Sequence, residues 1–228
     1  MSGKAVRKRI KQFLFPRTCI LCRKGACLTH IPVCKDCIPA LREMLSMPCG
    51  FCGLPAAECI CPHSRQVRSL FWYDHPTAHQ LLAMLKYHAK RHKVEFLADR
   101  LAALCNGVYD GVTYVPRRPK EKRLYGYDHA KYLAEAVAKR LALPLVTTLE
   151  CNSLLEQKYL SSSQREKSMY GRYTAITKTV EHSPRLLLVD DLYTTGATMR
   201  ACSRILRKAG AKSVSCVTLA RVQHQYQP

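Results

Sequence analysis

Residues 186–198 read LLLVDDLYTTGAT, and this stretch decides the fold class. It opens with four apolar residues, a short run typical of a strand buried on both faces of a sheet. Two acidic residues end the run, and a turn at Gly196 leads into the helical pattern of residues 197–208. Another strand pattern follows at residues 213–219. The order strand, helix, strand predicts the parallel sheet of an α/β domain.

The polar residues of this stretch predict a site for a phosphorylated ribose. Asp190 and Asp191 come at the carboxyl end of the predicted strand, where parallel sheets bind ligands. Adjacent carboxylates accept hydrogen bonds from vicinal hydroxyls and can position Mg²⁺ carried by substrate phosphates. The helix start that follows offers unpaired amides and hydroxyls to a 5′-phosphate. The predicted site comprises Asp190, Asp191, Thr194, Thr195, Gly196, Ala197 and Thr198, with the two carboxylates as candidate catalytic groups.

The α/β pattern extends back to residue 66. Strands are predicted at 69–73, 112–115 and 145–148, and helical spacing covers 78–104 and 129–141. Cations follow the strand at 112–115, where a loop could neutralise a leaving pyrophosphate. A solvated charge run is the alternative interpretation. The residues predicted to face the pyrophosphate are Arg117, Arg118, Lys120 and Arg123, with Lys122 in the same run.

Cysteine pairs dominate residues 1–65, which have little apolar periodicity and which we interpret as a module held by metal ligands rather than by a core. Cysteines at such spacing provide thiolates for tetrahedral zinc, and eight of them fit two closed structural sites. The simplest pairing places Cys19, Cys22, Cys34 and Cys37 in one site and Cys49, Cys52, Cys59 and Cys61 in the other. A cross-braced pairing uses the same residues in another order, and His63 is an alternative to Cys61.

Composition limits the cellular setting and the partners. The chain has 228 residues, a formal charge of +21 and thirteen cysteines. We find no apolar run of about 18 residues, the length that a membrane span needs, and no cleavable leader, so a cytoplasmic protein is expected. The positive charge favours polyanionic partners. Two domains are predicted, a double zinc ribbon with a basic arm at 1–65 and an α/β domain at 66–228.

The chain resembles the ComF/GntX family, in which a cysteine-rich zinc ribbon precedes a phosphoribosyltransferase-like domain. The resemblance rests on FPRTCILC at 15–22, CGFCGLP at 49–55, LLAMLKYHAKR at 81–91, VP at 115–116 and LLLVDDLYTTGATM at 186–199. It implies a type I phosphoribosyltransferase-like parallel sheet after the double zinc ribbon. It further implies that 115–123 form the pyrophosphate loop, and that Gln157, Leu160 and Arg165 lie beside the site. The implied ligand is 5-phosphoribosyl 1-diphosphate (PRPP) with Mg²⁺.

This chain also departs from the family pattern. Residues 125–129 read YGYDH where these proteins usually have RGFNQ. Purine-handling relatives of the larger superfamily carry an aspartate at the position of Thr194 to deprotonate the base, and a threonine cannot take that role at neutral pH. We therefore expect phosphoribosyl binding more firmly than catalysis.

Three functions follow from these observations. One is a phosphoribosyltransferase with an unknown amine or base acceptor. Another, implied by the resemblance, is a competence factor that handles incoming single-stranded DNA with a helicase partner during natural transformation. Basic segments at 4–11 and 86–93, with Tyr87 for stacking, are its candidate DNA contacts, and solvated helix faces are the alternative. The third is a regulator that senses PRPP without turnover.

Overall fold

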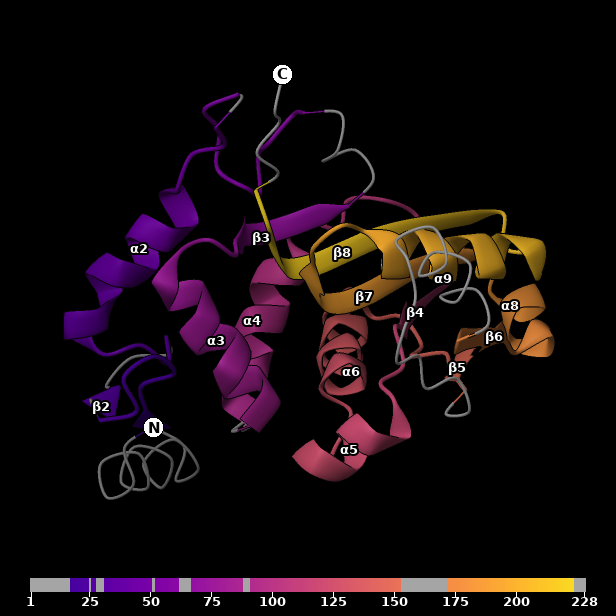
Figure 1. The fold of residues 1–228 in the computed structure, drawn as a ribbon, viewed down its shortest axis with the longest axis horizontal. Coiled ribbons are helices and arrows are strands. Elements are labelled where there is room, and N and C mark those ends of the chain that lie inside the picture. Colours follow the sequence, from indigo (N-terminus) through magenta and orange to yellow (C-terminus); the bar gives the residue numbers. More distant parts are fainter. Residues whose placement is uncertain are drawn as a thin grey trace, which may run out of the picture.

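The computed structural model describes residues 17–24, 26–27, 31–50, 52–61, 67–87, 91–152 and 172–223. Its central sheet has four parallel strands in the order β3, β8, β7, β4 (Figure 1). These strands are β3 (Arg68–Trp72), β4 (Gly111–Tyr114), β7 (Arg185–Tyr193) and β8 (Ser213–Arg221). The parallel sheet predicted from the stretch at 186–198 is confirmed, with that stretch beginning in the central strand β7.

Helices cover both faces of the sheet (Figure 1). The helices α3 (Pro76–Tyr87), α4 (Arg91–Ala102) and α6 (His129–Leu141) share a core with Leu187 and Val189 of β7. The helix α9 (Ala197–Lys208) packs on Leu186 and Leu188, which point to the other face. This alternation explains why the whole run is apolar, since both faces of β7 are buried.

Helix bounds agree with the sequence pattern at 129–141 and 197–208. The helical spacing over 78–104 corresponds to two helices, because α3 ends at Tyr87 and α4 begins at Arg91. Apolar spacing alone could not reveal that break, since each helix continues to bury an apolar face. The strand predicted at 145–148 was wrong. Only Leu145 makes an isolated bridge there, and β5 (Leu149–Cys151) forms further along, paired antiparallel with β6 (Tyr173–Ala175).

The cysteine-rich segment packs against the sheet domain rather than standing apart. It contains β1 (Arg17–Thr18), β2 (Ala26–Cys27), η1 (Lys35–Cys37) and α2 (Ile38–Ser46). In Figure 1, α2 lies beside α3 and the end of β3, and contacts join these elements. Ile20 and Met44 belong to the same buried cluster as Leu81 of α3. The expectation of a module without a core is therefore wrong, because its apolar residues extend the core of the sheet domain.

Two short helices complete the fold. One is α5 (Pro119–Tyr125), within the segment predicted as a pyrophosphate loop, and the other is α8 (Thr177–His182). Pro119 at the start of α5 has the fixed φ that suits a first helical position, and Gly126 ends the helix with φ 77°. Among the helices described, none has the length and apolar character that crossing a bilayer requires.

Candidate functional site

The candidate site is built around two adjacent carboxylates on β7. The strand continues past them to Tyr193, so Asp190 and Asp191 point to opposite faces of the sheet. Both side chains are buried, with exposed fractions of 4% for Asp190 and 2% for Asp191. Burial of two ionisable groups at this end of a central strand is costly unless cations or ligands satisfy them.

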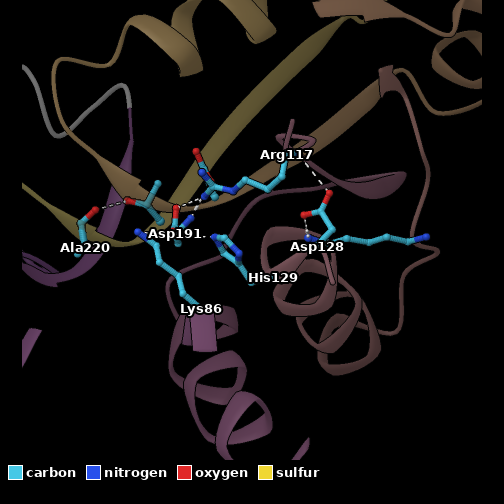
Figure 2. Close-up of polar contacts among 9 residues, drawn as sticks. Lys86, Arg117, Asp128, His129, Asp191 and Ala220 are labelled. Carbon is cyan, nitrogen blue, oxygen red and sulfur yellow. Dashed lines mark hydrogen bonds and ion pairs between the residues drawn. The ribbon is translucent and has the colours of Figure 1, made fainter. Parts of the chain in front are cut away.

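Basic side chains from three parts of the fold surround Asp191 (Figure 2). Arg117, in the loop after β4, donates one hydrogen bond of 2.8 Å to Asp190 Oδ1 and a second to Asp191 Oδ1. Lys86 of α3 places its Nζ 3.7 Å from Asp191 Oδ2, and His129 at the start of α6 places its Nε2 3.2 Å from the same oxygen. Arg117 therefore bridges the two carboxylates, while the other two side chains contact Asp191 alone.

These surroundings separate the pKa values of the two carboxyl groups. Burial raises the pKa of Asp190 to about 8, with the charge of Arg117 opposing the rise and that of Asp191 adding to it. Burial acts in the same direction on Asp191, but the contact with His129 and the charges of Arg117 and Lys86 outweigh it and hold its pKa below the usual value. The pair therefore carries about one negative charge at neutral pH.

The raised pKa of Asp190 predicts a pH-dependent effect of the Asp190→Asn substitution on stability. In the unfolded chain this carboxyl ionises near pH 4, whereas in the folded chain it holds its proton up to about pH 8. The free energy of unfolding of the native protein therefore falls as the pH rises from about 4 to 8, and asparagine removes this loss. Between pH 5 and pH 9, the free energy of unfolding of the variant should rise relative to that of wild type by at least about 1 kcal/mol. For a chain of this size, this corresponds to a rise of roughly 2–4 °C in the relative midpoint of thermal unfolding.

Thermal unfolding at each pH measures this difference. Asp110→Asn is the matched control, because Arg185 lowers the pKa of Asp110 and that carboxylate is ionised in both states above pH 5. Its offset from wild type should stay constant between pH 5 and 9. A constant offset for Asp190→Asn as well would contradict the assignment of a protonated Asp190.

A cavity of about 190 Å³ opens onto the carboxylate pair. Five of the predicted site residues line it, and these are Arg117, Arg118, Asp190, Asp191 and Thr198. Thr194 and Thr195 are exposed in the turn before α9, and Gly196 adopts φ 75° there. A side chain at Gly196 would overlap the Tyr193 ring, so the turn requires glycine. Lys120 and Arg123 are exposed on α5 and are not among the residues that line the cavity.

Four further residues belong to this site and were not predicted for it. Lys86 and His129 contact Asp191, and Arg172 and Tyr173 line the cavity. Lys86 was expected in a DNA-binding segment, but its ammonium faces a buried carboxylate instead. The other end of that segment, Lys93, has an exposed fraction of only 3%. The sequence showed that both residues are basic, but it could not show which group each lysine contacts.

The unusual residues at 125–129 have structural roles around the carboxylates. Asp128 accepts hydrogen bonds from the backbone amides of Arg117 and Lys131 at 3.2 Å each, which joins the pyrophosphate-side loop to the start of α6 (Figure 2). Tyr127 donates from its hydroxyl to the Leu85 carbonyl, next to Lys86. The segment YGYDH therefore helps to position the basic side chains that face Asp191. The residues Gln157, Leu160 and Arg165, implied by the resemblance, lie outside the described residues.

The eight paired cysteines form two compact groups of sulfur atoms. One contains Cys19, Cys22, Cys34 and Cys37, and the other contains Cys49, Cys52, Cys59 and Cys61, with every Sγ of a group within 4.8 Å of the others. The Sγ–Sγ distances are 3.7 Å for Cys22–Cys34, 3.8 Å for Cys49–Cys61 and 3.6 Å for Cys52–Cys59. Four sulfurs at 2.3 Å from one zinc ion stand about 3.8 Å apart, so both groups have the size of a tetrahedral zinc site.

The environment of the second group also suits a metal. Amides of Leu54 and Ile60 bond to the Cys52 sulfur and lower its pKa to about 6, whereas burial raises the pKa of Cys61 to about 12. The cysteines of this group thus differ widely in pKa, and a bound dication would keep all four sulfurs deprotonated. Trp72, the single tryptophan of the chain, packs against Cys49 and Cys61. His63, the alternative ligand, lies outside the described residues. Both groups can hold a metal ion, and zinc is the metal that their donor set favours.

Comparison with known proteins defines the class. Residues 129–228 match the family described as "Phosphoribosyl transferase domain". The chain therefore combines a type I phosphoribosyltransferase-like domain, built on a parallel sheet, with cysteine groups at the N-terminus that can form zinc ribbons.

Its relatives carry two kinds of name. The DNA utilization protein YhgH of Salmonella typhimurium is 26% identical over 225 residues, which cover 90% of this chain and 97% of that protein. Competence protein ComFC of Bacillus subtilis is 24% identical over 208 residues, covering 83% and 84%. Competence protein F of Haemophilus influenzae is 23% identical over 235 residues, covering 89% and 96%. This chain is a homologue of these competence and DNA utilization proteins, which confirms the resemblance noted from its motifs.

Proposed function

We propose that this protein binds PRPP with Mg²⁺ at the Asp190–Asp191 site and acts on single-stranded DNA during DNA uptake. The observation that carries the first part is the buried carboxylate pair beside the start of α9. The carboxylates accept hydrogen bonds from the 2′ and 3′ hydroxyls of the ribose. The first amides of α9 bind the 5′-phosphate, since Gly196 at the helix cap gives no side chain to them and the Ala197 amide makes only a long contact of 3.4 Å with the Thr195 hydroxyl.

Arg117 is the residue that changes partners on binding. Its guanidinium bridges both carboxylates in this structure and lies in the loop that the resemblance assigns to pyrophosphate. When ribose hydroxyls take its place on the carboxylates, Arg117 is free to bind the diphosphate with Arg118. Lys86 and His129 continue to hold Asp191, which keeps that carboxylate oriented toward the cavity.

The donor atoms of the site also fit Mg²⁺. Adjacent carboxylate oxygens are hard ligands, and the ion would be held by Asp190 and Asp191 together with the diphosphate oxygens. When bound, it supplies charge neutralisation for a departing pyrophosphate. Thr194 stands where purine-handling relatives carry the base-deprotonating aspartate, and the further carboxylate among the described residues that line the cavity, Glu121, belongs to α5 rather than to the turn before α9. Binding without rapid transfer is therefore the proposed activity, and transfer to an amine or base acceptor is the alternative.

The second part of the proposal rests on the names of the relatives and on the charge of the chain. Homologues named for competence and DNA utilization align along about 90% of its length or slightly less. The formal charge of +21 suits a nucleic acid partner. We place this role in the cytoplasm, on incoming single strands, with a helicase as the partner that the resemblance implies.

Calorimetric titration tests the ligand. PRPP with Mg²⁺ should bind saturably with a one-to-one stoichiometry, and chelation of the Mg²⁺ should weaken the binding. A parallel pyrophosphate assay should show release far slower than binding, whereas rapid release would favour the transferase alternative. ATP with Mg²⁺ controls for general attraction of polyanions, because all its phosphates are on the 5′ oxygen and its C1′ carries a base instead of the C1 diphosphate of PRPP. Equal affinity for ATP and PRPP, or no heat at millimolar PRPP, would refute the proposed ligand.

A further inference from the structure

A second and larger cavity lies on the α9 face of the sheet. Its volume is about 940 Å³, and we call it the α9 groove. It exists because β3 is shorter than β8. Strand β8 begins at Ser213, but its pairing with β3 begins only at Val217, so residues 213–216 have no strand on that side within the described part of the chain. The loop at 104–109, the start of β3 and the outer face of α9 enclose the notch.

The groove is lined by five cations. Arg200, Arg204 and Arg207 follow the spacing of one helix face and form a row about 10 Å long on α9. Arg68 from the edge strand and Lys208 at the end of α9 complete the set. No aspartate or glutamate is among the described residues that line the groove.

The alternative interpretation of these cations is a solvated helix face without a binding role. The composition of α9 argues against this alternative. Acidic residues at i+3 or i+4 would pair with the cations of a solvated basic face and compensate their charge. Helix α9 has no acidic residue in any of its twelve positions. Within the described residues, Arg68, Arg200, Arg207 and Lys208 take part in no salt bridge, and Arg200 donates only to the Thr195 carbonyl at 2.8 Å. Uncompensated charge on a concave surface raises the local concentration of anions.

We propose that the α9 groove binds the phosphate backbone of single-stranded DNA. This inference rests on the proposed role in DNA uptake and assigns that role to a surface separate from the PRPP site. A notch admits one strand, whereas readers of duplex DNA insert a protruding helix or ribbon into a groove about 12 Å wide. Tyr109 also lines the notch, and its ring offers a stacking surface for a base. The Gly107 amide donates to its hydroxyl at 3.2 Å.

The groove and the ribose-phosphate site share helix α9. Thr198, in its first turn, lines the carboxylate cavity, whereas Arg200, two residues later, lines the groove. A variant in the later turns of α9 can therefore remove DNA contacts without removing a PRPP contact. This separation allows the two sites to be tested independently.

Fluorescence polarisation with a labelled 20-nucleotide oligo(dT) tests the groove in the full chain. Arg204→Glu/Arg207→Glu should weaken binding at least about tenfold. The slope of log affinity against log salt should become shallower by about 1.4, as expected when two phosphate contacts are lost. The matched control is Lys139→Glu/Lys178→Glu, which changes the net charge equally at exposed positions of α6 and α8. It should change affinity much less. PRPP titration of the groove variant should match wild type.

The outcomes separate this inference from the proposed function. Failure of the wild type to bind the oligonucleotide at low salt would refute the DNA role itself. Wild-type binding with equal losses in both double variants would refute the groove alone. Tighter binding of a duplex than of the single strand, or full displacement by a poly-glutamate peptide at equal charge, would assign the groove to another partner and also overturn the inference.

Photocrosslinking provides a measurement that needs no folded variant. Oligo(dT) that carries 5-iododeoxyuridine should form adducts on the wild-type peptides that contain Tyr109 or residues 200–208. Adducts confined to α5 would show that the DNA binds along the exposed basic residues of that helix, Lys120 and Arg123, and would overturn the proposal.

Discussion

Asp190→Asn/Asp191→Asn is expected to weaken PRPP binding in the presence of Mg²⁺ by at least about 100-fold. Each hydrogen bond from a ribose hydroxyl to a carboxylate contributes about 1.5–3 kcal/mol, and two such bonds correspond to roughly a factor of 10² to 10⁴. Amide oxygens accept more weakly and are poor ligands for Mg²⁺. Calorimetric titration of both proteins at the same pH and Mg²⁺ concentration measures the loss.

The control for this double variant is Asp99→Asn/Asp110→Asn, which makes the same two chemical replacements elsewhere on the protein. These two carboxylates pair with Arg140 and Arg185, outside the lining of the cavity. PRPP affinity should stay within about threefold of wild type for the control. Circular dichroism of the site variant should retain the native spectrum, since asparagine has nearly the same size and shape as aspartate at both positions. A site variant that binds as tightly as the control would exclude the carboxylates from ligand recognition.

Cys49→Ser is expected to lower the zinc content from two ions per chain to one and to disrupt the second cysteine group. Structural zinc contributes about 10–16 kcal/mol to the folding of zinc-finger peptides, so three remaining thiolates cannot maintain the site at wild-type affinity. Trp72 reports the local change because its side chain is 1% exposed and packs against Cys49 and Cys61. Its emission should shift to longer wavelength as water reaches the indole.

Two further variants make this zinc experiment specific. Cys22→Ser should also cost one zinc ion, but with little change in Trp72 emission, because Cys22 belongs to the first group. Cys27→Ala should retain both ions. Burial raises the pKa of Cys27 to about 11, and its sulfur belongs to neither group. Metal analysis that finds fewer than one zinc per wild-type chain, or two in Cys49→Ser, would contradict the assignment.

Local patterns predicted those features that depend on neighbours in the chain. The helices at 129–141 and 197–208 were predictable because each repeats apolar residues along one face and is bounded by a capping or turn residue. The cysteine groups were predictable in composition because a C-x-x-C pair already presents two sulfurs to one ion. Their partition into two groups of four in chain order remained open until the sulfur positions distinguished it from a cross-braced arrangement.

Features that need distant segments to meet were missed. Lys86 and His129 come from different helices, and only the packing of α3 and α6 against one face of the sheet brings them to Asp191. The pyrophosphate segment contains the helix α5, which turns Lys120 and Arg123 outward. Charge alone could not distinguish these residues from Arg117, because all of them lie within seven positions of one another.

The sequence by itself determined the parallel α/β class, the carboxylate pair at the end of a buried strand and the eight cysteines that can serve as metal ligands. Each of these is encoded by periodicity or by spacing within a few residues. The tertiary structure alone decided which basic side chains contact the carboxylates and where the basic α9 groove lies. The physical reason is that burial and long-range contact set both features. A lysine becomes a carboxylate partner, and a notch opens beside a short edge strand, only when the sheet and its helices are packed together.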